Sequence, residues 1–276
     1  MNSTFGPQTL RRALCTAFLL AVAQLSAHAS LLSAGVNLGY ADTTPNNRWA
    51  VFTLNANPGD VNTMSSGAQI FGDVAFAGTG NSSLSGTGSI RGDVVSRSTG
   101  VLQKSSSFAI TGSTFNNRDA ALAQGVSDAY AASSAAFNLA STSGYPTTIN
   151  QNTSLTLNDS TGGNVVLHLT DFVLSGTASL TLQGTAATTY IINVTNKFAL
   201  SGSSVVLLGG VKAENVLFNV TGTGDATLSG SSVLNGTLLA VNRTVKMAGS
   251  ATVYGEVIAN KVALSGTSSV RRPISP

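Results

Sequence analysis

The chain has 276 residues, of which 9% are charged, 42% are hydrophobic and 29 are glycine. Such a chain is apolar enough to bury a sizeable core, which excludes disorder through a lack of apolar residues. The sequence contains neither a Lys/Arg cluster nor basic residues interleaved with aromatic ones, and it therefore gives no support to nucleic-acid binding.

The first segment, residues 1–29, has the pattern of a secretory signal peptide. Arg11 and Arg12 precede an apolar run of 11 residues, ALCTAFLLAVA, and small residues at Ala27 and Ala29 form an A-x-A cleavage site. This run is much shorter than the roughly 20 residues that a membrane-spanning helix needs. We therefore expect cleavage after Ala29 and an exported protein, extracellular or at the cell surface, with the periplasm as an alternative.

Cleavage at that point changes the chemistry that is left. Cys15 and His28 depart with the leader, so the remaining chain has no cysteine and one histidine, His168. Removing Arg11 and Arg12 from the 14 basic residues leaves 12 against 11 acidic ones, a net charge of about +1. A disulfide framework and a cysteine-based zinc site are both excluded.

A short unit centred on Leu-Ser-Gly-Ser recurs along the chain. Repetition at about 20 residues is typical of stacked solenoid coils, each of which must turn the same corner. Short strands with glycine-rich turns also suit a β-sandwich, which is the alternative fold. The glycines of the unit are Gly86, Gly112, Gly176, Gly202, Gly230, Gly249 and Gly266, and the last five are 26, 28, 19 and 17 residues apart.

The unit FALSGSSVVLL shows why such a repeat makes a coil. Phe198 and Leu200 alternate with Ala and Ser, as in a strand with one buried face. Gly202 is free to adopt positive φ at the corner, and Val205 and Leu207 then resume the inward set. The sequence predicts that leucines of successive coils stack on one another.

Residues 117–140, NRDAALAQGVSDAYAASSAAFNLA, break this pattern and predict one helix. An apolar stripe of Leu122, Val126, Tyr130 and Phe137 is expected to face the solenoid. Asn117 is the expected N-cap, Asp119 lies in the positive first turn, and Gly144 and Pro146 follow the end.

The predicted fold is mainly β, an irregular β-solenoid (β-helix) with one long α-helix packed alongside. With no linker between its parts, we expect one domain over 30–276. It comprises N-terminal coils and a cap over 30–113, the helix over 117–140, and C-terminal coils over 146–276.

The stretch Thr189 to Gly224, TYIINVTNKFALSGSSVVLLGGVKAENVLFNVTGTG, resembles the core of the bacterial choice-of-anchor A family. More distantly, the Gly-Asp-Val segments at Gly72 and Gly92 and the Ala-rich helix are similar to the bacterial ice-binding β-helix family. The resemblance implies an exported β-helix with a helix alongside, often displayed at the surface. The ending SSVRRPISP has neither an apolar anchor nor a sorting motif, so we expect no transmembrane anchor in the mature chain.

Candidate catalytic groups are few and scattered. His168 is the single candidate imidazole, and no G-x-S-x-G motif supplies it with a nucleophile. Asp73 and Asp93 share a Gly-Asp-Val context, which predicts turn residues on neighbouring coils. No calcium-loop motif occurs, so we predict no catalytic, metal or cofactor site. The other carboxylates are Asp42, Asp60, Asp119, Asp128, Asp159, Asp171, Glu214, Asp225 and Glu256.

These observations favour a non-enzymatic structural or adhesive protein of the bacterial surface or extracellular matrix. Its expected partners are an extracellular surface, a glycan, a protein, ice or a second copy of itself. The alternative function is ice binding, although a regular Thr-x-Thr ladder is absent and the triplet occurs after the leader only at Thr221 to Thr223. The Ser- and Thr-rich ridges are equally compatible with a role in solubility alone.

Overall fold

The computed structural model describes residues 49–55, 57 and 59–272, in which the chain winds into stacked three-strand coils. The expected signal peptide therefore lies outside the described residues. All strand pairs are parallel, which confirms the solenoid and excludes a sandwich of antiparallel sheets. Successive coils lie one strand spacing, about 4.8 Å, apart.

The strands form three faces. Face A contains β1 (Val51–Thr53), β4 (Val74–Phe76), β7 (Val94–Ser96), β10 (Thr114–Phe115), β13 (Asn164–Leu169), β16 (Thr189–Val194), β19 (Val216–Val220) and the first halves of β22 (Thr237–Met247) and β24 (Val257–Leu264). Face B contains β2 (Val61–Met64), β5 (Asn81–Leu84), β8 (Leu102–Lys104), β11 (Ile149–Gln151), β14 (Phe172–Ser175), β17 (Phe198–Ser201), β20 (Ala226–Ser229) and the second halves of β22 and β24. Face C contains β3 (Gln69–Phe71), β6 (Ser89–Arg91), β9 (Ala109–Ile110), β12 (Leu155–Asn158), β15 (Ser179–Gln183), β18 (Ser204–Leu208), β21 (Val233–Asn235), β23 (Thr252–Tyr254) and β25 (Ser269–Arg271).

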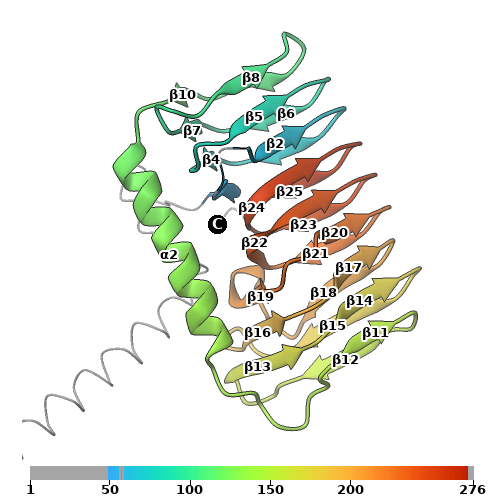
Figure 1. The fold of residues 1–276 in the computed structure, drawn as a ribbon. Helices are drawn as coiled ribbons and strands as arrows, with labels where there is room; N and C mark the ends of the chain where they lie inside the picture. The colour runs from blue at the N-terminus through green and yellow to red at the C-terminus, as the bar shows by residue number, and fades with distance from the viewer. Residues whose placement is uncertain (1–48, 56, 58, 273–276) are drawn as a thin grey trace, which may run out of the picture.

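The order of the coils in space differs from their order in the chain. The first coil lies in the middle of the stack, and the next two extend it to one end (Figure 1). Helix α2 (Asp119–Phe137) then runs back along face A, and the remaining coils start at the far end of the stack. A short 3-10 helix, Ala213–Asn215, directly precedes β19 in these coils. The last coil finally pairs with the first, because β24 pairs with β1 and β2 and β25 pairs with β3.

Left-handed residues form the corner between faces B and C, as predicted. Gly86, Gly176, Gly202, Gly230, Gly249 and Gly266 all have φ between 63° and 73°. At Gly202 an added Cβ would lie 3.0 Å from the carbonyl oxygen of Gly176, so the corner has little room for a side chain. Ser66, with φ of 58°, takes the same position in the first coil without a glycine.

The assignment of Gly112 to this corner was wrong. Gly112 lies against Gly92, and Gly92 lies against Gly72, at the corner between faces C and A. The equivalent of the repeated unit in that coil is Ser105–Phe108, which contains no glycine. The Gly-Ser pair that Gly112 shares with units such as that of Gly202 therefore occurs at two different corners.

Inside the solenoid, apolar side chains at equivalent positions of successive coils stack in columns. Leu174, Leu200 and Leu228 occupy one register and are at most 1% exposed, as the sequence predicted. Phe172 and Phe198 stack with ring centroids 5.2 Å apart. Because each coil repeats the inward set of its neighbour, the core is continuous along the stack.

Helix α2 is confirmed, but the residues predicted to face the solenoid are mostly not the buried ones. Tyr130 and Phe137 are 38% and 40% exposed, and Val126 is only partly buried. Leu122 alone of the predicted stripe is fully buried. The helix instead buries small side chains, which bring its axis close to face A: Gly125, Ala129, Ala132, Ser133 and Ala136.

The helix is also shorter than the predicted range 117–140, because it begins at Asp119 and ends at Phe137. The residue before its first turn is Arg118, rather than Asn117, and its side chain makes no capping hydrogen bond. Asp119 lies in the first turn as predicted, where its carboxylate accepts hydrogen bonds from the backbone N–H of Ser98 at 3.3 Å. A negative charge there is favourable because it faces the positive end of the helix dipole.

Candidate functional site

His168 lies on β13, and its side chain contacts the segment that ends helix α2. Its Nε2 is 2.8 Å from the carbonyl oxygen of Leu139. A carbonyl only accepts, so Nε2 carries the hydrogen and donates it. The ring also meets the edge of Phe137, with centroids 5.5 Å apart. The side chain thus ties the helix terminus to face A.

Two buried asparagines continue the column that His168 begins. Asn193 follows His168 in register on β16, and Asn219 follows Asn193 on β19. The Nδ2 of Asn193 donates to the carbonyl oxygen of Ala136 at 2.9 Å, and that of Asn219 donates to the carbonyl oxygen of Ser133 at 2.9 Å. The three side chains form a polar column that fixes the helix on the solenoid.

Within the part of the chain that the structure describes, the acidic residues do not converge on a reaction centre. Asp73 and Asp93 stack on neighbouring coils as predicted, and their Oδ1 atoms accept the backbone N–H groups of Asp93 and Ser113 at 2.8 and 2.7 Å. Asp159 accepts several hydrogen bonds in its loop, chiefly from the Thr161 hydroxyl, which hold its pKa below the ordinary value despite burial. Among the described residues, no three His, Cys, Asp or Glu side chains gather as a metal site would require.

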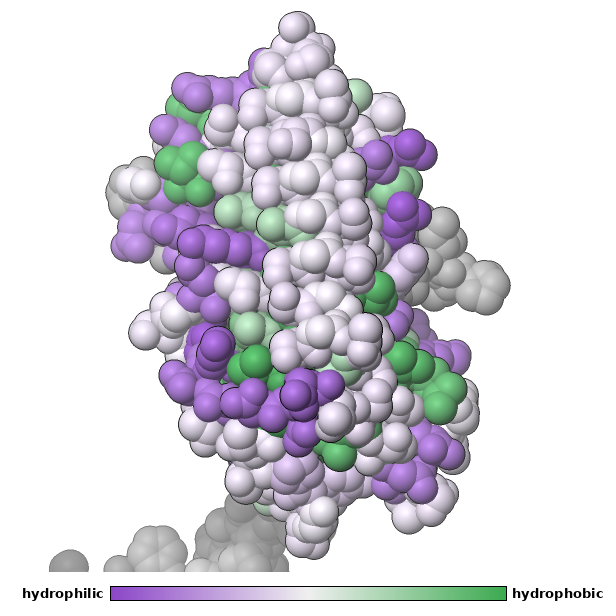
Figure 2. Space-filling model, turned by 90° about the vertical axis from the view of Figure 1, so that its right-hand side faces the viewer, coloured by the Kyte–Doolittle hydropathy of each residue, from purple (hydrophilic) through white to green (hydrophobic). Residues whose placement is uncertain are grey.

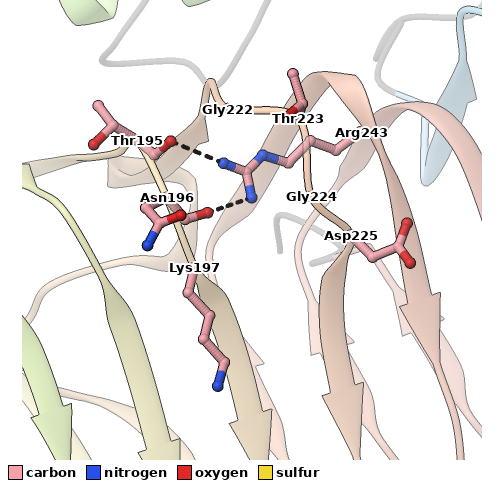
Figure 3. A pocket seen from close by; sticks show the side chains of 8 residues that line it. All are labelled: Thr195, Asn196, Lys197, Gly222, Thr223, Gly224, Asp225 and Arg243. Atoms are coloured by element: carbon pink, nitrogen blue, oxygen red, sulfur yellow. Dashed lines mark hydrogen bonds between the residues drawn. The ribbon is translucent and has the colours of Figure 1, made fainter.

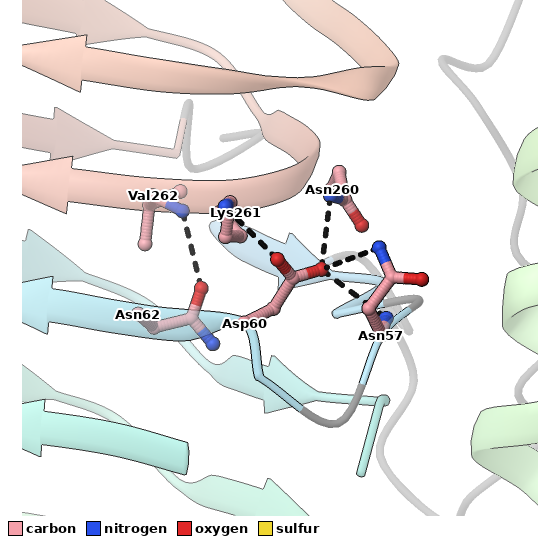
Figure 4. A network of polar contacts seen from close by, with 6 residues as sticks. All are labelled: Asn57, Asp60, Asn62, Asn260, Lys261 and Val262. Atoms are coloured by element: carbon pink, nitrogen blue, oxygen red, sulfur yellow. Dashed lines mark hydrogen bonds and ion pairs between the residues drawn. The ribbon is translucent and has the colours of Figure 1, made fainter. Parts of the chain in front are cut away.

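Asp60 is part of a network that joins the first coil to the last (Figure 4). Its Oδ1 lies 2.9 Å from the Nζ of Lys261, and its Oδ2 accepts from Asn260 at 3.2 Å. Burial raises the pKa of the Asp60 carboxyl, but these contacts outweigh burial and leave its pKa below the ordinary value. Beside it, the Oδ1 of Asn62 accepts the backbone N–H of Val262 at 3.1 Å. The network stabilises the seam between coils.

A pocket of about 390 Å³ lies beside the buried Arg243, between the loops that follow β16 and β19 (Figure 3). Arg243 is 1% exposed, and its guanidinium donates to the carbonyl oxygens of Asn196 and Thr195 at 2.6 and 3.2 Å. Burial lowers its pKa, and nearby Asp225 partly offsets this. Two of its donors hold loop carbonyls, so Arg243 braces the loops, while its buried Nε has no hydrogen-bond partner.

The most regular surface is the corner between faces B and C. Viewed from the side opposite the helix, Figure 2 shows a pale strip of intermediate hydropathy along nearly the whole molecule. Neighbouring coils contact each other there through hydroxyls, as where Ser250 and Thr267 lie 3.0 Å apart. We call this strip the hydroxyl ridge; its residues are Ser105, Ser85, Ser65, Ser265, Ala248, Ser229, Ser201 and Ser175, with Ser107, Thr87, Thr267, Ser250, Ser231 and Thr177 beyond the corner.

Charged side chains interrupt the flat faces on both sides of the ridge. Face B presents Lys246, paired with Asp225 at 2.6 Å, and Lys261. The single Thr-x-Thr triplet does not lie on a face at all, because Thr221 to Thr223 belong to the loop beside the Arg243 pocket. The residues of the ridge are themselves uncharged, and the Lys104 ammonium contacts one end of it by donating to the carbonyl oxygen of Ser105 at 3.1 Å.

Face C carries a feature that was missed from the sequence. Arg91, Phe71, Arg271 and Tyr254 follow one another in register on four coils, and we call them the basic–aromatic column. The two guanidiniums reach the Phe71 ring from the coils on either side of it, with their central carbons 4.8 and 4.2 Å from the ring centroid. Basic and aromatic residues are thus interleaved in space, although the sequence shows no such interleaving. Only the coil register reveals it.

Fold and surface together define the class: a parallel β-solenoid braced by one helix, with long regular surfaces. The chain belongs to the family described as an ice-binding-like adhesive domain, whose model matches residues 21–270. This confirms the expected resemblance to ice-binding β-helix proteins at the level of the family. Among the described residues, no helix has the length and apolar composition needed to cross a membrane.

Solved structures share the fold. An ice-binding protein from an Antarctic bacterium, Flavobacteriaceae, is 20% identical with a TM-score of 0.54, and the match covers 88% of this chain and 51% of that one. A glycosylated ice-binding protein (LeIBP) from an Arctic yeast is 17% identical with a TM-score of 0.51, covering 83% of this chain and 92% of that one. At these identities the likeness shows the fold alone. No curated protein matches the sequence.

Proposed function

We propose that this chain is an exported, non-enzymatic adhesive protein of the bacterial surface or extracellular matrix. The observation that carries the proposal is the hydroxyl ridge, which runs along the coils without a charged residue. A long repetitive surface suits an extended target, because many weak contacts along it add up to stable attachment. The family description as an adhesive domain supports the same function. The narrower resemblance to choice-of-anchor A proteins stays a prediction.

The groups capable of catalysis have structural partners that account for them. His168 donates to the helix terminus, and Asp73 and Asp93 hold backbone N–H groups at their corner. A hydrolase would instead need a nucleophile and a base within hydrogen-bond reach of each other. This supports a role for the protein as a binding surface. A hydrolytic activity that His168→Ala abolishes would contradict the proposal.

Attachment of the purified protein to bacterial cells and to matrix glycans tests adhesion directly. Placing lysines on the ridge, as Thr177→Lys with Ser231→Lys, should reduce attachment at least tenfold because charges interrupt the contact surface. Both positions are exposed, so the fold should remain, and circular dichroism verifies this. Unchanged attachment by a folded variant would exclude the ridge, and no attachment by the native protein would exclude adhesion.

Ice binding is the second candidate function, and the same ridge favours it. Hydroxyl and methyl groups recur there at the strand spacing of about 4.8 Å on a rigid backbone. At micromolar concentration, an ice-binding protein shapes ice crystals into facets and slows recrystallisation. Folded protein that leaves round discs would exclude this function. Faceted crystals would place ice binding ahead of adhesion, and Thr177→Tyr with Thr267→Tyr would then show whether the ridge is the contact surface.

A further inference from the structure

We propose that the basic–aromatic column on face C binds acidic polysaccharide chains through their carboxylates. The inference rests on the proposed adhesive function and names one ligand class and its site. Arg91 and Arg271 are the charged residues on the nine strands of face C, which contain no Asp or Glu. Both arginines are exposed. The face therefore offers two positive groups in an otherwise uncharged sheet.

Neither guanidinium has a carboxylate partner among the described residues. Arg271 donates from Nε to the Ser269 hydroxyl at 3.3 Å, and its remaining N–H groups are open to a ligand. The carboxylates of Asp73 and Asp93 lie at the adjoining corner, where each accepts a backbone N–H. They limit the positive potential of the face. Recognition must therefore depend on close contact between the ligand and the two guanidinium groups rather than on long-range attraction.

The ring of Phe71 holds both forks in place. With a guanidinium carbon 4.8 Å away on one neighbouring coil and 4.2 Å away on the other, the ring restricts the motion of both arginines. Less side-chain entropy is then lost when a ligand binds. An arginine fork matches a carboxylate with two parallel hydrogen bonds. The arrangement thus provides two pre-positioned carboxylate sites, two coils or roughly 10 Å apart.

A linear acidic polysaccharide fits this spacing because its carboxylates recur along an extended chain. Tyr254, 43% exposed, follows Arg271 on the next coil and offers an aromatic surface to a sugar ring. Nucleic acid fits less well, because its affinity depends on the number of phosphates that a protein neutralises and the column supplies two charges. Weak binding at one column becomes firm attachment when many copies contact one matrix.

Calorimetric titration of the folded protein with polygalacturonate tests the assignment. Fully methyl-esterified polygalacturonate is the matched ligand, because it keeps the backbone and removes the charge. We expect binding to the acid form, at least tenfold weaker binding to the ester, and a binding constant that falls with added salt. Arg91→Gln and Arg271→Gln should each weaken binding about fivefold or more, and together should abolish it. Tyr254→Ala should weaken binding about threefold.

Lys246→Gln is the matched control, because it removes one positive charge from face B. Equal losses from Lys246→Gln and Arg271→Gln would show that net charge alone matters and would overturn the site. Equal binding of the acid and its ester, or tighter binding of oligothymidylate, would overturn the ligand class. If the native protein attaches to cells but does not bind polygalacturonate, the basic–aromatic column is excluded as the polysaccharide site, whereas the adhesive function is still supported. If the native protein attaches neither to cells nor to any matrix glycan, the proposed adhesive function itself is excluded.

Discussion

The Ser133 hydroxyl on helix α2 donates a 2.7 Å hydrogen bond to the Oδ1 of Asn219 on β19, 86 residues further along the chain. Asn219 returns the contact, since its Nδ2 donates to the carbonyl oxygen of Ser133 at 2.9 Å and to the Oδ1 of Asn193 at 2.8 Å. Both residues are buried. One amide thus satisfies several polar groups between helix and sheet.

Asn219→Ala should lower the free energy of unfolding by about 2–3 kcal/mol, because it leaves buried polar groups of Ser133 and Asn193 without partners. Urea unfolding followed by circular dichroism measures the loss. Asn150→Ala, at an exposed position of β11, is the control and should change stability by less than about 0.5 kcal/mol. A loss from Asn219→Ala as small as that of the control would contradict the structural role of the column.

Ala129→Leu should destabilise the protein by about 1–3 kcal/mol, because the fully buried Ala129 separates the helix from face A and the larger side chain has no room. Ala131→Leu, on the exposed side of the same helix, makes the same chemical change and should leave the thermal midpoint almost unchanged. Equal effects of the two substitutions would mean that the helix does not pack on face A through its small residues.

Gly202→Val should cost about 1–3 kcal/mol, because a branched side chain disfavours the φ of 70° at this corner. The added Cβ would also lie 3.0 Å from the carbonyl oxygen of Gly176 on the next coil. Chemical denaturation of the purified variant measures the cost. Gly163→Ala, an exposed glycine without positive φ, is the comparison and should be nearly neutral. A neutral Gly202→Val would mean that the corner relaxes.

Acid should weaken the seam between the first and last coils through Asp60. The folded pKa of Asp60 lies below its ordinary value of 3.8, so the charged form favours folding. Its contribution is complete above pH 3.8 and is lost as pH falls through the folded pKa. Asp60→Asn should lower stability at pH 7 and flatten the dependence of the urea midpoint on pH in that acid range. An unchanged acid slope would contradict this.

Much of the coil was predictable from sequence because its determinants are local. Alternation around Phe198 and the glycine at Gly202 specify two strands and the turn between them within a few residues. The buried side of helix α2 was not predictable in the same way. Ala129 and Ala132 carry little apolar signal beside Tyr130 and Phe137, yet close packing selects the small residues. Side-chain size decided the orientation of the helix, whereas hydrophobicity suggested another.

The pairing of the first and last coils and the basic–aromatic column had no local signal. Phe71 and Arg271 are adjacent because β25 pairs with β3, and no periodicity links two strands so distant in sequence. Gly112 shows the converse error, because a local motif matched while its place in the coil differed. Features that depend on which coils are neighbours require the structure.

The seam also governs when the protein can finish folding. Asn62 on β2 and Val262 on β24 are hydrogen-bonded across 200 residues, so the N-terminal coils emerge from the ribosome long before the strands that cover their inner edge. Contacts so distant in the chain close slowly, because the loop entropy is lost before the contact forms. A nascent chain that stops short of residue 257 lacks those strands. It should remain sensitive to protease until the strands from residue 257 onward are available to complete the stack.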